Sequence, residues 1–189
     1  MLDIQTPRMT YEPVSDTLGR FEVEPLDRGF GHTFGNSLRR VLLSSLEGAA
    51  VTSVRSEGVQ HEFTTIPGLR EDVTDVILNL RRLVARLHGE VGEIEVELSK
   101  VGPGPVTAGD ISAPADLEIL NPELEIGNLE AGARLDMILM ISRGRGYVPA
   151  ELNKGPGTTI GVIPVDSNFS PVLRVRYEII PARVCQRPA

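Results

Sequence analysis

Residues 20–46 read RFEVEPLDRGFGHTFGNSLRRVLLSSL and contain the pattern that sets the fold class. The apolar side chains of Phe21 and Val23 alternate with glutamates, which is typical of a half-exposed strand. A glycine-rich bend follows, and the apolar spacing after it predicts a helix over about 32–46, ended by Gly48. This stretch therefore indicates a strand that leads directly into a helix.

Downstream of this helix the pattern is mostly that of strands. Apolar and acidic residues alternate over 93–98, apolar residues occupy every second position over 135–141, and alternation returns over 173–179. A second helix is predicted over 71–88, with acids at its start and arginines at its end, as the helix dipole favours. This order indicates an α+β fold with antiparallel sheets rather than repeated βαβ units.

The first predicted helix has two faces of different character at 100° per residue. The face opposite the apolar stripe carries Asn36, Arg40 and Leu43 and has no acid or lysine. That composition fits a solvated arginine beside a stray leucine, or a second buried face against another chain, and we favour the second. The apolar stripe predicts the side turned toward the core and comprises Phe34, Leu38, Val41, Leu42 and Ser45.

The second predicted helix has a stronger apolar stripe and a charged opposite face. Asp75, Leu78 and Arg82 lie on the opposite face, with Arg81 on its flank. A solvated surface explains them, because single exposed apolar residues are normal. The stripe predicts burial in the core and comprises Val73, Val76, Ile77, Leu80, Leu83, Val84 and Leu87.

The composition excludes several classes of protein. The 189 residues suffice for one domain or two small ones, and 41% of them are hydrophobic, as in an ordinary globular protein. The apolar runs are too short to span a bilayer, and the N-terminus has no secretory signal. The single cysteine, Cys185, excludes a disulfide framework within the chain, so we expect a cytoplasmic protein. A net charge of −7 gives no reason to expect binding to bulk nucleic acid.

Two segments could carry chemistry. The glycine-rich turn Gly29–Gly35 follows a strand and opens a helix, as phosphate-binding turns do. A sharp turn into a closely packed helix explains it better, because the preceding strand is acidic and no βαβ unit follows. The segment 143–150, RGRGYVPA, fits contact with acidic protein better than with nucleic acid, given the net charge. No spacing of nucleophile, histidine or metal ligands supports catalysis, so we expect no cofactor and no metal.

Five strings in colinear order carry a resemblance to a known family. They are EPLDRGFGHTFGNSLRRVLLSSLEGAAVTSV at 24–54, HEFTTIPGLREDVTDVILNLRRL at 61–83, GPGPVTAGDI at 102–111, RGRGYVPA at 143–150 and IPVDSNFSPVLRVRYEI at 163–179. Together they resemble the N-terminal domain of the bacterial RNA polymerase α subunit. The resemblance implies a discontinuous dimerisation domain over 1–48 and 166–189, with a mostly antiparallel β domain, the insert domain, over 49–165.

The resemblance also implies three protein interfaces. The dimer interface with a second α subunit comprises Phe30, Phe34, Leu38 and Leu42. The β′-subunit interface comprises Asp75 and Arg81. The β-subunit interface comprises Asn36, Arg39, Arg40, Leu43, His61, Glu62, Phe63, Arg143, Arg145 and Tyr147. Arg40 matches the arginine that is most critical for the β subunit, and a guanidinium suits the capture of a carboxylate or of carbonyl oxygens.

The function implied is assembly of DNA-directed RNA polymerase. An α dimer forms first and recruits the β subunit and then the β′ subunit, whereas the nucleotidyl-transfer site belongs to those large subunits. Whether such a non-catalytic subunit counts as an enzyme stays open. The alternatives are a stand-alone β-rich protein-binding module, a degenerate α paralogue and, third, a nucleotide-binding enzyme that uses the glycine turn.

The sequence departs from the family near its end. The family continues past Arg187 into another strand and a long helix that packs on the first helix in the dimer, and then into a linker and a DNA-binding domain. Because this sequence ends at Ala189, we expect a weakened dimer and no direct contact with DNA. Cys185 also stands where the family usually has an acid.

Overall fold

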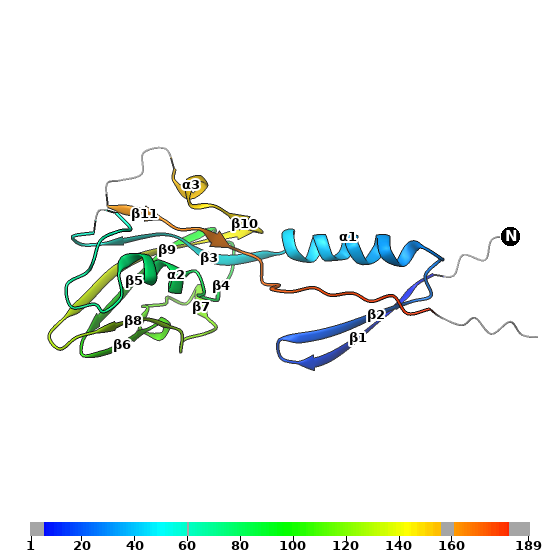
Figure 1. The fold of residues 1–189 in the computed structure, drawn as a ribbon, viewed down its shortest axis with the longest axis horizontal. Helices are drawn as coiled ribbons and strands as arrows, with labels where there is room; N and C mark the ends of the chain where they lie inside the picture. The colour runs from blue at the N-terminus through cyan, green and yellow to red at the C-terminus, as the bar shows by residue number, and fades with distance from the viewer. Residues whose placement is uncertain (1–5, 60, 156–160, 182–189) are drawn as a thin grey trace, which may run out of the picture. The chain divides into compact units, whose positions relative to one another are not determined.

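The computed structural model describes residues 6–59, 61–155 and 161–181, so Cys185 lies outside the described residues. The chain divides into two compact units, one of Met1–Leu42 and Arg174–Ala189 and the other of Leu43–Leu173. The predicted α+β class is confirmed (Figure 1). The elements, in chain order, are β1 (Arg8–Ser15), β2 (Leu18–Glu24), α1 (Phe30–Ser44), β3 (Glu47–Ser56), α2 (Val73–Leu80), β4 (Ala85–Leu87), β5 (Glu93–Val101), β6 (Gly104–Thr107), the 3-10 turn η1 (Ala108–Asp110), β7 (Leu117–Ile119), β8 (Glu125–Leu129), β9 (Arg134–Arg145), β10 (Tyr147–Val148), α3 (Ala150–Asn153), β11 (Val162–Pro164) and β12 (Ser167–Asn168).

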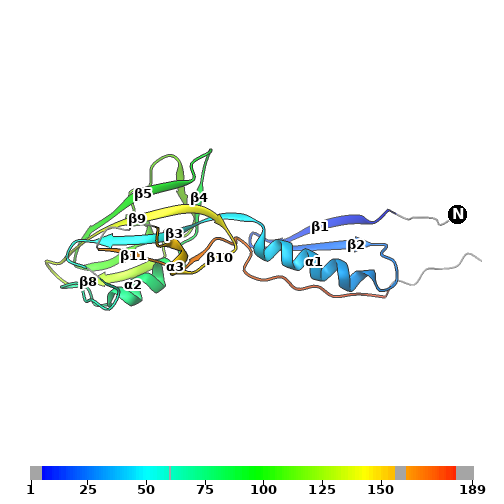
Figure 2. The same ribbon diagram turned by 90° about the horizontal axis from the view of Figure 1, so that it is seen from above.

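A six-stranded antiparallel sheet forms the frame of the second unit. Its strands follow the order β5-β9-β3-β4-β7, and β11 also pairs with β3. The long strands β3 and β9 pair over nearly their whole length, and the sheet curls around α2 and β8 (Figures 1 and 2). The register of β3 shifts between Val51 and Ser53, where the carbonyl of Thr52 accepts a hydrogen bond from the Val165 N–H at 2.9 Å. This bulge therefore anchors the segment 162–169 to the sheet.

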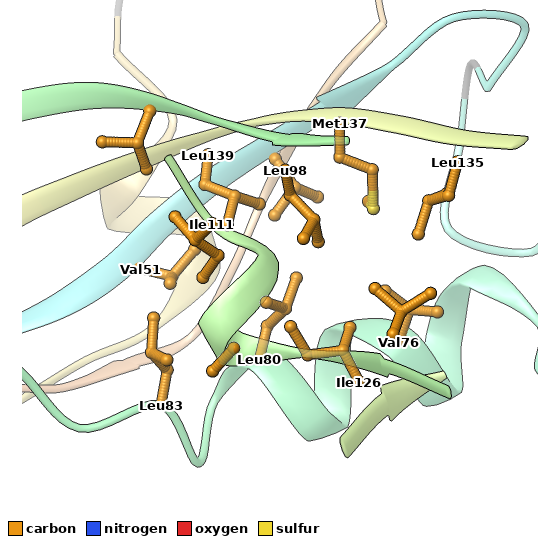
Figure 3. Packing of buried hydrophobic residues seen from close by; sticks show 14 of the residues in the cluster. Val51, Val76, Leu80, Leu83, Leu98, Ile111, Ile126, Leu135, Met137 and Leu139 are labelled. Atoms are coloured by element: carbon orange, nitrogen blue, oxygen red, sulfur yellow. The ribbon is translucent and has the colours of Figure 1, made fainter. Parts of the chain in front are cut away.

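The core of the second unit lies between the sheet and α2. The alternation predicted over 93–98 and 135–141 is confirmed, because the buried residues are Val96 and Leu98 in β5 and Leu135, Met137, Leu139 and Ile141 at alternate positions of β9. Side chains of α2 and β8 point toward those of β5 and β9 (Figure 3). The glutamates of β5 face outward along this edge strand, as period-two alternation requires.

The second predicted helix is correct in its first half and wrong in its second. The helix ends at Leu80 instead of 88, and Ala85–Leu87 forms β4, which pairs with β7. The side-chain amide of Asn121 holds the connection between them. It accepts a hydrogen bond from the Val84 N–H at 2.8 Å and donates one to the Arg82 carbonyl at 3.0 Å. These tertiary hydrogen bonds replace those that a longer helix would make.

The helix α1 begins and ends two residues earlier than predicted. Close packing explains the glycines near its start. A Cβ added at Gly35 would lie 2.6 Å from the ring of Tyr177, and one added at Gly31 would lie 3.3 Å from the Ile179 side chain. The missing side chains therefore let the segment 174–181 approach the helix. This role removes the reason to assign a phosphate site to the glycine turn.

The strand predicted over 173–179 is wrong. In the described chain this segment joins no sheet, and of its alternating apolar side chains only Val175 is half-buried, whereas Leu173, Tyr177 and Ile179 are exposed. Alternation specifies which side chains share a face, but a strand also needs a neighbouring backbone to pair with. The side chains of Tyr177 and Ile179 lie against Gly35 and Gly31 of α1.

The first unit exposes many apolar side chains. None of its described residues is buried, and even the stacked rings of Tyr11 and Phe21, with centroids 4.8 Å apart, are more than half exposed. Exposed apolar side chains in such number are candidates for contact with another protein. The exposed large apolar residues of this unit outside the segment 174–181 are Met9, Tyr11, Val14, Leu18, Phe21, Phe30 and Val41.

Asp110 ties η1 to the edge strand β5. Its Oδ2 accepts hydrogen bonds from the Lys100 ammonium at 2.7 Å and from the Thr107 N–H at 2.8 Å. Burial alone would raise the pKa of the Asp110 carboxyl, but the hydrogen bonds from Lys100 and Thr107 outweigh it and lower that pKa below its ordinary value. Asp110 therefore stabilises the folded chain in its charged form.

Asp110→Asn should cost about 1 kcal/mol of unfolding free energy at pH 7, because it removes charge-assisted hydrogen bonds. A lowered folded-state pKa contributes stability above the ordinary value and loses it as the pH falls through the folded value. The difference between wild type and variant should therefore shrink below about pH 4. Urea unfolding at several pH values measures it, with the exposed Asp116→Asn as control. A difference that stays constant with pH would contradict the assignment.

Candidate protein-protein interfaces

The exposed faces of α1 carry most of the interface residues predicted on this helix. Asn36, Arg39 and Arg40 are exposed, and Leu43 is half-buried. The residues predicted for the dimer interface lie on another face of the helix. Of these, Phe30 is 54% exposed, and the half-buried residues are Phe34, Leu38 and Leu42.

The loop between β3 and α2 presents His61, Glu62 and Phe63 to solvent. Two threonines fix its backbone: Thr64 donates to the His61 carbonyl at 2.8 Å, and Thr74 donates to the Glu62 carbonyl at 2.9 Å. Phe63 is 79% exposed. A backbone held in this way presents the phenyl ring as a fixed apolar contact, which suits a binding surface.

Of the residues predicted in β9 and β10, Arg143 is turned inward, whereas Arg145 and Tyr147 are exposed. The half-buried Arg143 donates through Nη2 to the carbonyls of Leu87 and Gly89, each at 2.9 Å, so it secures the end of β4. Arg145 forms an exposed ion pair with Glu47 across the β3–β9 ladder at 2.6 Å. Tyr147 is exposed and remains available for contacts.

Asp166, which was not predicted as an interface residue, interacts with both Arg81 and Tyr147. The Arg81 guanidinium lies 3.2 Å from the Asp166 carboxylate, and the Ala150 N–H donates to its other oxygen at 2.9 Å. Partial desolvation, the Asp166 charge and a hydrogen bond to Asp166 raise the pKa of the Tyr147 phenol above its ordinary value. Asp75, the other predicted β′-facing residue, is exposed in the first turn of α2.

The segment 162–169, called the strap here, is fixed to the sheet by buried polar groups. The hydroxyl of Ser167 is fully buried and donates to the Val51 carbonyl at 2.7 Å. The Asn153 side chain donates to the Val165 carbonyl at 2.6 Å and to the Ser167 hydroxyl at 2.9 Å. Because each of these polar groups has its hydrogen-bond partner, α3 and the strap are held together beside β3 (Figure 1).

A pair of glycines makes room for the end of the strap. Gly48 and Gly144 lie opposite each other in the β3–β9 ladder. Phe169 is buried against them: a Cβ at Gly144 would lie 2.8 Å from its ring, and a Cβ at Gly48 would lie 2.0 Å from its carbonyl oxygen. Side chains at these two positions would therefore displace the strap.

Other features of the described residues mark no further site of reaction. A groove of about 540 Å³ lies at the ends of β3, β5 and β9, beside Arg55, Glu97 and Asp136, and none of the predicted interface residues lines it. Among the described residues no group of three or more His, Cys, Asp and Glu could hold a metal ion. In the same part of the chain no helix is long and apolar enough to cross a membrane.

In the sequence, the antiparallel β unit is inserted between the two parts of the other unit. The family model described as RNA polymerase Rpb3/RpoA insert domain matches residues 52–170, more than half of the chain. The chain belongs to this family. The resemblance to the N-terminal region of the RNA polymerase α subunit is therefore confirmed.

Curated relatives extend the match to nearly the whole chain. A DNA-directed RNA polymerase subunit alpha of Carboxydothermus hydrogenoformans is 53% identical over 186 residues, which cover 98% of this chain and 59% of the relative. Those of Acidothermus cellulolyticus and Saccharopolyspora erythraea are 54% and 55% identical over 187 residues, or 99% of this chain and 54% and 52% of the relatives. The chain thus spans a little over half the length of these relatives.

Proposed function

We propose that this chain acts as the assembly subunit of bacterial DNA-directed RNA polymerase. The observation that carries the proposal is the identity of 53% to 55% over 98% to 99% of the chain with relatives of that name. The role is that of a scaffold in the cytoplasm, which brings the other subunits together. The nucleotidyl-transfer site belongs to those partners.

We assign dimerisation to the ends of the chain, predicted as 1–48 and 166–189. We assign capture of the other subunits largely to the insert domain at 49–165. The exposed apolar residues of the first unit support the first assignment, because a protein surface of this kind is normally covered. A second copy of this chain is the partner proposed for the face with Phe30 and Phe34. A fold built as helix plus hairpin, without a buried side chain among its described residues, needs such a partner to form a core.

The β subunit binds the face of α1 with Arg40, together with the loop at 61–63 and the segment 143–150, which carries Tyr147. The β′ subunit binds the surface of α2 with Asp75 and Arg81. Exposure of Arg40, Phe63 and Tyr147 supports this division, because an interface needs accessible arginine and aromatic anchors. The two copies of the chain are identical, so each surface needs to work in only one copy.

Arg40→Ala should weaken capture of the β subunit from the same organism by about 30-fold or more, as expected when one partner of a buried charge contact is removed. Its effect on the unfolding midpoint should be small, because Arg40 is exposed in the isolated chain. Co-expression with the β subunit followed by measurement of complex mass and affinity tests this. Arg55→Ala, an exposed arginine of β3 outside the predicted interfaces, is the matched control. Equal capture by wild type and Arg40→Ala would overturn the proposed contact.

One observation favours a second candidate function, a stand-alone β-rich binding module. The second unit has its own buried core and does not depend on the first unit for it. A module of this kind would bind its partner through the loops at 61–63 and 143–150 and would leave Arg40 unused. The Arg40→Ala experiment therefore also separates the two functions.

A further inference from the structure

One carboxylate joins three parts of the second unit that are distant in the sequence. Oδ2 of Asp166 lies 3.2 Å from Nη1 of Arg81, at the C-terminal end of α2. Oδ1 accepts the hydrogen bond from the N–H of Ala150, the first residue of α3. Tyr147, in β10, pairs with Asn168, two residues beyond Asp166, and the Asp166 carboxylate contributes to the raised pKa of its phenol. Asp166 is thus the common contact of α2, β10 and α3.

We infer that Asp166 is a positioning residue that holds Arg81 and Tyr147 in one fixed arrangement, so that capture of both the β and the β′ subunit depends on it. The inference rests on the proposed function, which assigns Tyr147 to the β-subunit surface and Arg81 to the β′-subunit surface. It adds that these two surfaces form one coupled unit. Asp166 itself need not touch either partner.

The backbone on both sides of Asp166 is fixed by contacts that do not involve its carboxylate. Its neighbours Val165 and Ser167 are buried, and both are bonded to the sheet through the N–H of Val165 and the hydroxyl of Ser167. Pairing of Val148 with Ser167 ties the same stretch to β10. A carboxylate mounted on rigid backbone can impose its geometry on the flexible arginine, which an exposed and mobile acid cannot do.

The exposure of the three side chains favours positioning over direct contact. Both oxygens of Asp166 are engaged within the unit, and its side chain is 30% exposed. The Arg81 side chain is 37% exposed and Tyr147 is 57% exposed, so both remain accessible to a partner. The guanidinium keeps further N–H donors beyond the Nη1 group at Asp166, and a planar arginine held from one side can present them in a fixed direction.

Asp166→Asn tests the inference, because asparagine keeps the size and removes the charge. We expect the variant to bind the β subunit about tenfold more weakly, and to bind β′ about tenfold more weakly when β′ is titrated onto the complex isolated at saturating β subunit. Asp136→Asn removes a similar exposed ion pair, with Arg134 on β9, and should change neither affinity. Loss of one affinity alone, or of neither, while the wild type binds both subunits, would overturn the inference.

Two measurements on the isolated chain distinguish failure of this inference from failure of the proposed function. In Asp166→Asn the pKa of Tyr147 should fall toward its ordinary value, measured by ultraviolet titration as the difference from Tyr147→Phe in each background. Amide hydrogen exchange at Ala150 should accelerate, because its acceptor is weakened. If both are unchanged, Asp166 does not position these elements. If both change but the wild type binds neither large subunit, the positioning stands and the proposed function fails.

Discussion

Gly48→Ala should destabilise the second unit by about 2 kcal/mol or more, within the range that added core volume costs. The new Cβ would lie 2.0 Å from the carbonyl oxygen of Phe169 and 3.1 Å from its carbonyl carbon. Backbone atoms cannot rotate aside as a side chain can, so the strap itself has to move. That movement would break the contacts that place Ser167 and Asp166.

Urea unfolding of the variant and of Gly92→Ala measures this effect. Gly92 is the matched control, because a Cβ there would meet nothing within 4 Å. The control also corrects for the loss of backbone freedom in the unfolded chain, which by itself stabilises alanine over glycine. An unfolding free energy for Gly48→Ala equal to that of Gly92→Ala would show that the strap does not lie against β3 as described.

Leu139→Ala should cost about 2–5 kcal/mol, the range measured for large-to-small changes in protein cores. Leu139 lies in the middle of β9, is 0% exposed, and belongs to the cluster that joins the sheet to α2 (Figure 3). The neighbouring strands cannot close the space, because their ladders fix the backbone on both sides of β9. The unfolding midpoint should fall by about 10 °C.

Calorimetry of Leu139→Ala beside Leu152→Ala provides the comparison. Leu152 lies on α3 and is 75% exposed, so the same chemical change should alter the midpoint by less than about 2 °C there. Leu139→Ala should also lower the enthalpy of unfolding, because packing contacts are lost. Similar midpoints for the two variants would contradict the core assigned to the second unit.

Burial was more predictable from the sequence than secondary structure. The stripe predicted for the second helix places Leu83 and Leu87 in the core, and both are buried, although they lie beyond the end of α2. Apolar side chains go inside whichever backbone carries them. The end of the helix at Leu80 depends instead on Asn121, some forty residues later, and no local pattern reports such a tertiary hydrogen bond. Val84, predicted to be buried, is exposed because the connection turns there.

For the candidate interfaces, too, the sequence indicated individual residues but not the tertiary contacts between them. Motif resemblance could name Arg81 and Tyr147 because each stands in a recognisable string. It could not show that Asp166 links them, because that contact arises only when the strap lies along β3. A cue was present in the string at 163–179, where three polar residues, Asp166, Ser167 and Asn168, lie between Val165 and Phe169. Sequence alone did not distinguish Arg143, turned inward to the end of β4, from Arg145 two residues on.

The glutamates of β5 protect the sheet against aggregation. β5 is an edge strand, and an unpaired edge invites the strands of other molecules to add to it. One end of the edge is covered where Leu98 bridges to Ile111 and the Ser112 N–H bonds to Glu97. Along the remainder Glu93 and Glu95 repel a second copy of the same edge. The exposed edge of this sheet is therefore a poor site for pairing between copies of the second unit.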